Sequence, residues 1–189
     1  GFAIDTGITL SYVPTDDGSV KLCSVNFAGE QTFSVCKTPK KQGDWADYLR
    51  GAAWALARRY ELRFGLDAVI EGTLPVGGLS SSAAVILAFL TALCRINSVK
   101  LSRAELIDVA LDAERLFVGV HVGKLDQSCE VYSKKDCLLY LDTKSDSYEL
   151  IPRNESAPPF AIAIFFSGVE RTLAGSPFNV RVDELKAAS

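Results

Sequence analysis

A glycine- and serine-rich turn leads directly into the most apolar stretch of this chain. Residues 75–84 read PVGGLSSSAA, and Ala83 to Cys94 is apolar apart from Thr91. A helix that is apolar on every side must be covered on every side, so these residues predict a buried central helix around which the fold is built. Its first turn carries unpaired N–H groups and a partial positive charge. Small residues there predict a phosphate pocket, and the plainer alternative is that one serine caps the helix.

The periodicity on either side of this helix mixes strands and helices. Strand-like stretches are separated by turns, of which Thr15 to Gly18 is the clearest. The period changes to three and four residues after Asp44, a predicted N-cap, and a Ser102/Glu105 capping box starts a later helix that runs to Phe117. Strands are predicted at residues 2–13, 20–27, 31–36, 67–71, 137–142, 148–151 and 160–166, and helices at 44–60, from Ser80 to 94, and 102–117.

Composition excludes several classes of protein. The 189 residues are 48% hydrophobic and carry a net charge of −3 without a dense basic block, which predicts a globular protein that does not bind nucleic acid. Five cysteines without a C-x-x-C pair, beside one histidine, argue against a zinc site or a disulfide framework and favour reduced thiols in the cytoplasm. The longest apolar run is shorter than the roughly 18 to 20 residues that a membrane span needs.

Longer motifs then indicate a family. PVGGLSSSAA lacks the lysine of G-x-x-x-x-G-K-[ST], but it resembles P-x-x-x-G-L-S-S-S-A, the phosphate-binding motif of the GHMP kinases. Three further segments resemble galactokinases: DWADYLRGAAWAL, AERLFVGVHVGKLDQ and SGVERTLAGSPFNVRVDEL. The resemblance implies an α+β fold similar to domain 2 of ribosomal protein S5, with a mixed sheet backed by helices.

The same resemblance implies a sugar 1-kinase that uses ATP and Mg²⁺ to phosphorylate galactose. Asp126 would accept or orient the proton of the attacking sugar hydroxyl, and Gly123 would lie beside the sugar. Glu114 and the Ser82 hydroxyl would hold magnesium, which prefers oxygen ligands and keeps several waters. The residues implied to bind the ATP phosphates are Gly77, Gly78, Leu79, Ser80, Ser81, Ser82 and Ala83.

Departures from the galactokinase pattern keep other functions open. His121 to Gln127 reads HVGKLDQ where galactokinases usually have P-C-G-I-M-D-Q. The alternatives are a related kinase acting on arabinose, a uronic acid or N-acetylgalactosamine, or a non-catalytic relative that senses sugar and nucleotide. The upstream R-x-N-[LI]-I-G-E-H-x-D-Y segment is not present in the sequence. We therefore expect residues 1–189 to be a GHMP kinase N-terminal domain without its first strand and without a C-terminal domain, inactive alone and prone to self-association.

Overall fold

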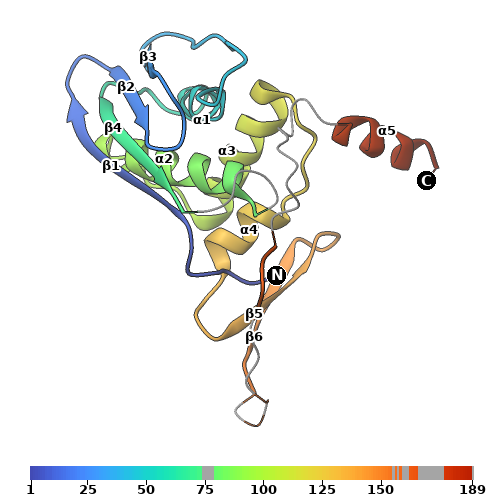
Figure 1. The fold of residues 1–189 in the computed structure, drawn as a ribbon. Helices are drawn as coiled ribbons and strands as arrows, with labels where there is room; N and C mark the ends of the chain where they lie inside the picture. The colour runs from blue at the N-terminus through green and yellow to red at the C-terminus, as the bar shows by residue number, and fades with distance from the viewer. Residues whose placement is uncertain (74–78, 155, 157, 159–161, 166–176, 189) are drawn as a thin grey trace.

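The computed structural model describes residues 1–73, 79–154, 156, 158, 162–165 and 177–188. Two sheets and several helices make up this part of the chain (Figure 1). The strands are β1 (Ile8–Thr15), β2 (Ser19–Ser24), β3 (Glu30–Ser34), β4 (Gly65–Gly72), β5 (Cys137–Asp142) and β6 (Ser147–Pro152). The helices are α1 (Asp47–Ala57), α2 (Ser81–Ile96), α3 (Arg103–Asp112), the π-helix η1 (Ala113–Val118), α4 (Leu125–Tyr132) and α5 (Phe178–Ala188).

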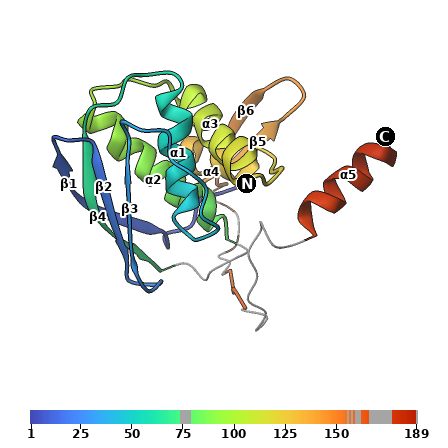
Figure 2. The same ribbon diagram turned by 90° about the horizontal axis from the view of Figure 1, so that it is seen from above.

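The larger sheet has the strand order β1-β4-β2-β3. β4 runs antiparallel to β1 and parallel to β2, while β2 and β3 are antiparallel, so the sheet is mixed. The parallel pair needs a crossover, which β3 and α1 supply. Helices α1 and α2 cover one face of this sheet (Figure 2). The predicted α+β class, with a mixed sheet backed by helices, is confirmed.

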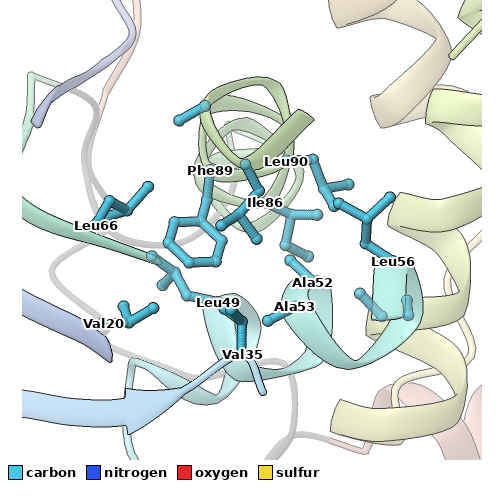
Figure 3. Packing of buried hydrophobic residues seen from close by; sticks show 14 of the residues in the cluster. Val20, Val35, Leu49, Ala52, Ala53, Leu56, Leu66, Ile86, Phe89 and Leu90 are labelled. Carbon is cyan, nitrogen blue, oxygen red and sulfur yellow. The ribbon is translucent and has the colours of Figure 1, made fainter. Parts of the chain in front are cut away.

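The core lies between that face of the sheet and the helices (Figure 3). β4 alternates as a half-buried strand should, with Leu66, Ala68 and Ile70 turned inward. Phe89 of α2 and Leu49 of α1 are fully buried against them. Each fully buried side chain of this size contributes roughly 1.5–3 kcal/mol, so this interface accounts for much of the folding free energy.

The central helix is buried on most of its surface, as its sequence predicts, but not on all of it. Ile86, Phe89, Leu90 and Leu93 are completely covered. On the opposite stripe, Thr91 and Arg95 are exposed, and Ala84 and Ala88 are half-buried. That stripe lines a cavity, so the prediction of burial on every side was wrong there.

Several boundaries differ from the sequence prediction. The first strand begins at Ile8, and Gly1 instead pairs with Leu139 of β5 through two backbone hydrogen bonds of 2.7 Å. The N-cap of α1 is Ala46 and not the predicted Asp44. The Asp44 carboxylate instead accepts a hydrogen bond from the Ala46 N–H at 2.9 Å, in the turn that precedes the helix. Residues 162–165 are not in a strand, whereas 160, 161 and 166 lie outside the described residues.

The third helix changes its character partway. Its N-terminus has the predicted capping box, in which Ser102 and Glu105 each bond the other's backbone N–H. After Asp112 the α-helix becomes the π-helix η1, which the sequence pattern did not predict. Gly119, with φ of 85°, ends it, and its N–H donates to the Glu114 carbonyl at 2.8 Å. π-helical turns are rare and frequently occur at functional sites.

Candidate phosphate and sugar site

The N-terminus of α2 carries the serines of the sequence motif. Ser80 adopts the left-handed conformation, with φ of 58° and ψ of 25°, and its side chain makes no capping hydrogen bond. Ser80 occupies the N-cap position before Ser81, but its hydroxyl does not satisfy a backbone N–H of the first turn, as the alternative of a capping serine would require. Leu79 and Ser80 line the cavity beside α2, while Ala83 is buried. Gly77 and Gly78 lie outside the described residues.

Glu114 is a buried carboxyl at the first turn of η1, with an exposed fraction of 1%. The side-chain amide of Gln127 donates a hydrogen bond to its Oε2, whereas Oε1 has no hydrogen-bond partner in the described part of the chain. Burial raises the pKa of Glu114 and nearby Asp126 adds to that rise, while the Ser82 hydroxyl and Gln127 oppose it. A buried carboxylate oxygen without a partner is costly unless a cation or donor meets it.

Asp126 lies in the first turn of α4 and is half-buried. Asp126 lines the same cavity as Leu79 and Ser80, and its charge acts on Glu114. The structure thus brings together Ser82, Glu114 and Asp126 from α2, η1 and α4. These are three of the residues singled out in the sequence.

The cavity has a volume of about 880 Å³. It runs along the open stripe of α2, with residues of the segment 2–12 opposite and α3 and α4 on the remaining side. A drug-sized ligand typically fills a pocket of about 300–1,000 Å³, so the space is large enough for a small molecule.

Glu130 is a carboxyl of the same cavity that the sequence motifs did not indicate. It stands one helical turn after Asp126, on the same face of α4. Glu130 is exposed to solvent, although it lines the cavity. Desolvation by the neighbouring protein, with the charges of Asp126 and Glu114, raises the pKa of Glu130 to about 8. Its spacing of four residues from Asp126 is the signal that could have identified it.

The loop before α4 contains Gly123, which is exposed. A Cβ at Gly123 would meet nothing within 4 Å, so no described part of the chain requires glycine there. Lys124 forms an ion pair with Asp146 in the turn between β5 and β6. His121 is exposed, and its backbone N–H donates to the Asn179 side chain at 2.9 Å.

The chemistry of the donor set suits a hard cation with few protein ligands. Across the described residues, no group of three or more His, Cys, Asp or Glu side chains could hold a metal ion. One carboxylate oxygen of Glu114, with the Ser82 hydroxyl near it, fits Mg²⁺, which commonly takes one or two carboxylates and completes its shell with water and phosphate oxygens.

The sequence also makes predictions about the cysteines and about the length of the apolar helices. All five cysteines are free, as their number and spacing predict. Among the helices of the described segments, none is long and apolar enough to cross a membrane.

Comparison with known proteins adds to this geometry. Residues 47–134 match the family model described as GHMP kinases N terminal domain. The chain is 36% identical to a galacturonokinase of Arabidopsis thaliana, with 98% of this chain and 49% of that protein covered. It is 35% identical to a galactokinase of Pyrococcus furiosus, with 96% and 51% covered. The chain therefore spans about half the length of the curated relatives it matches.

Solved structures agree with the sequence comparison. A Lactococcus lactis galactokinase complexed with galactose superposes with a TM-score of 0.85 at 28% identity, over 99% of this chain and 49% of that one. A mevalonate kinase of Methanococcus jannaschii shares the fold at 19% identity, with a TM-score of 0.59 over 68% of this chain and 42% of that one. Residues 47–134 therefore correspond to a GHMP kinase N-terminal domain, and the chain has galactokinases among its homologues.

Proposed function

We propose that the protein is an ATP-dependent sugar 1-kinase that converts galactose and ATP to galactose 1-phosphate and ADP. The observation that carries this proposal is the proximity of Ser82 and Asp126 to Glu114, together with the position of Asp126 in the lining of the cavity. Phosphoryl transfer depends mainly on positioning and on offsetting negative charge, so three such groups on three rigid elements suit it. The galactokinase homologues support the same reading.

The N-terminal turn of α2 would hold the ATP phosphates. Its backbone N–H groups, and the hydroxyls of Ser80 to Ser82, provide donors at the positive end of a helix of 16 residues. Gly77 and Gly78 belong to the same proposed loop, together with Leu79 and Ala83. Glycine there would let the backbone approach the phosphates closely.

Glu114 and Ser82 would hold the magnesium ion. When bound, Mg²⁺ offsets the negative charge of the phosphates. The unpartnered Oε1 of Glu114 supplies the oxygen, and the Gln127 amide fixes the other oxygen of the carboxylate.

Asp126 would accept the proton of the sugar hydroxyl, with Gly123 leaving room for the sugar. The hydroxyl oxygen forms a bond to the γ-phosphorus, the bond between that phosphorus and the oxygen of ADP breaks, and the proton passes to the Asp126 carboxylate. We place the enzyme in the reducing cytoplasm, because its five cysteines are free thiols.

A second candidate substrate is a hexuronic acid. The similarity to the Arabidopsis thaliana galacturonokinase covers 98% of this chain. Turnover of galactose and of galacturonic acid, compared at equal concentrations, separates the two candidates.

The experiment that tests the proposal replaces Asp126 by Asn in the protein expressed from its complete gene. Sugar-dependent ADP release should show kcat lower by roughly 10²–10⁴, with the KM for sugar changed less, because Asn keeps the shape but accepts no proton. Asp16→Asn, in an exposed turn, is the matched control.

Two outcomes would contradict the proposal. Near-normal turnover in Asp126→Asn would remove this residue as the base. A wild-type protein that binds ATP and sugar but releases no ADP would instead be a non-catalytic sensor.

A further inference from the structure

The loop between η1 and α4 is fastened by side chains from other parts of the chain. Lys41 donates to the Val118 carbonyl, and Arg115 Nε donates to the Val122 carbonyl at 2.8 Å. Asn179 makes two contacts: its Nδ2 donates to the Gly119 carbonyl at 2.7 Å, and its Oδ1 accepts from the His121 N–H at 2.9 Å. Asn179 therefore bonds a donor and an acceptor of the loop backbone at once.

Asn179 reaches this loop from a distant element. It is the second residue of α5, 58 residues after His121, and no residue of α5 is buried. Phe178 packs against the apolar cluster that contains Val118, Val120 and Val122. The rest of α5 extends away from the domain (Figures 1 and 2). The first turn of α5 is thus its point of attachment, and that point is the loop.

The loop has intrinsic freedom that such a contact would restrict. Gly119 has a φ of 85°, and Gly123 has open space around it. Glycine at two positions of a short segment raises the conformational entropy of the unrestrained loop. The loop ends at α4, whose first turn holds Asp126. A displaced loop would therefore move Gly123 and the start of that helix.

We infer that Asn179 is a positioning residue for the sugar side of the site: its amide fixes residues 119–121 and, through them, Gly123 and Asp126. This inference rests on the proposed function, because it assigns that loop to the sugar. A side-chain amide matches this pair of backbone contacts, since its nitrogen donates a hydrogen bond and its oxygen, in the same planar group, accepts one. An aspartate could still accept from His121, but it would turn a carboxylate oxygen toward the Gly119 carbonyl.

The test compares Asn179→Ala and Asn179→Asp with Arg181→Ala in the protein expressed from its complete gene. Arg181 lies on the same helix in an exposed ion pair with Glu184, so its replacement controls for changes in α5 itself. Hydrogen exchange at the His121 amide and steady-state kinetics with galactose and with ATP are measured for each variant. The melting temperature shows whether each variant is folded.

We expect Asn179→Ala to exchange the His121 amide roughly tenfold faster, because its acceptor is lost. The kcat/KM for sugar should fall roughly tenfold or more, mainly through KM, while the KM for ATP stays within about twofold. Asn179→Asp should retain most of the protection of the His121 amide and still lose sugar affinity. Arg181→Ala should match the wild type.

Two results overturn the inference: unchanged exchange at His121 in Asn179→Ala, or faster exchange with unchanged sugar kinetics. If Asn179→Ala does not fold, Asn179→Asp decides, and normal sugar kinetics in that variant refute the assignment. If the wild type phosphorylates no sugar, the proposed function fails and the inference falls with it. That outcome is recognised in the wild type alone, before any variant is compared.

Discussion

Glu114 and Gln127 show how the candidate site depends on single side chains. Both are buried, and one hydrogen bond between them uses Glu114 Oε2 and the Gln127 amide. Glu114 Oε1 and the side-chain oxygen of Gln127 are buried without a hydrogen-bond partner in the described part of the chain. Unpaired buried polar atoms cost roughly 1–3 kcal/mol each, so this pair lowers the free energy of unfolding. A cation bound to Glu114 would offset part of that cost.

Glu130 leads to a prediction about pH. Its pKa is raised from 4.5 to about 8 by partial desolvation and by Asp126 and Glu114. Below pH 4.5 the group is protonated in the folded and the unfolded chain and has no net effect on stability. Between about pH 4.5 and 8 the unfolded chain loses a proton that the folded chain keeps, so this group lowers the stability as the pH rises.

We expect Glu130→Gln to resemble the wild type at low pH and to become progressively more stable than it toward pH 8. Urea unfolding midpoints measured across this range would show it. Glu149→Gln, on the exposed strand β6, controls for removal of a surface charge. Parallel midpoint curves for wild type and Glu130→Gln would show that the folded state does not perturb Glu130.

At the scale of elements, the approach of α1 to η1 determines where Glu114 lies. Gly51 of α1 faces η1 so closely that a Cβ there would lie 3.0 Å from the Ala113 carbonyl oxygen and 3.1 Å from Phe117 Cδ1. Ala113 immediately precedes Glu114 in the chain. The glycine of the segment DWADYLRGAAWAL, Gly51, is therefore explained by close packing of the two backbones.

We predict that Gly51→Ala destabilises the protein by about 1–3 kcal/mol, because overpacking at a backbone oxygen outweighs the gain in helix propensity of about 1 kcal/mol. Urea unfolding measures the difference. Gly7→Ala is the control, since a Cβ at Gly7 would meet nothing within 4 Å. If Gly51→Ala instead stabilised the protein by the propensity difference, the close approach would not restrict this position.

At the scale of the whole molecule, the hairpin of β5 and β6 projects from the helical side of the domain (Figure 1). One of its faces exposes Leu138, Tyr140 and Ile151, with exposed fractions of 54%, 59% and 43%. A two-stranded sheet has little stability of its own, and apolar side chains on its open face favour association.

We predict that the 189-residue chain alone self-associates through this face. Light scattering after gel filtration should show a mass above 20.4 kDa that rises with concentration. Leu138→Lys combined with Ile151→Lys should shift the protein toward the monomer. Leu185→Lys, on exposed α5, should not. A monomer at every concentration would contradict the prediction.

Local patterns in the sequence determined much of this protein. The Ser102/Glu105 capping box, the bounds of β5 and the turn at Gly18 follow from neighbouring residues and agree with the structure. The resemblance to galactokinases also singled out Ser82, Glu114 and Asp126. Such features can be predicted from the sequence because a cap, a turn or an amphipathic period depends on a few adjacent residues.

The tertiary structure alone decided which distant groups meet. Gln127 bonds Glu114 across 13 residues, and Asn179 bonds the loop across 58 and 60 residues. The open stripe of α2 and the raised pKa of Glu130 likewise depend on what other elements cover. Periodicity tells which side of a helix is apolar, but a polar atom's partner and a carboxyl's desolvation are set by chain segments far away in sequence, so only packing fixes them.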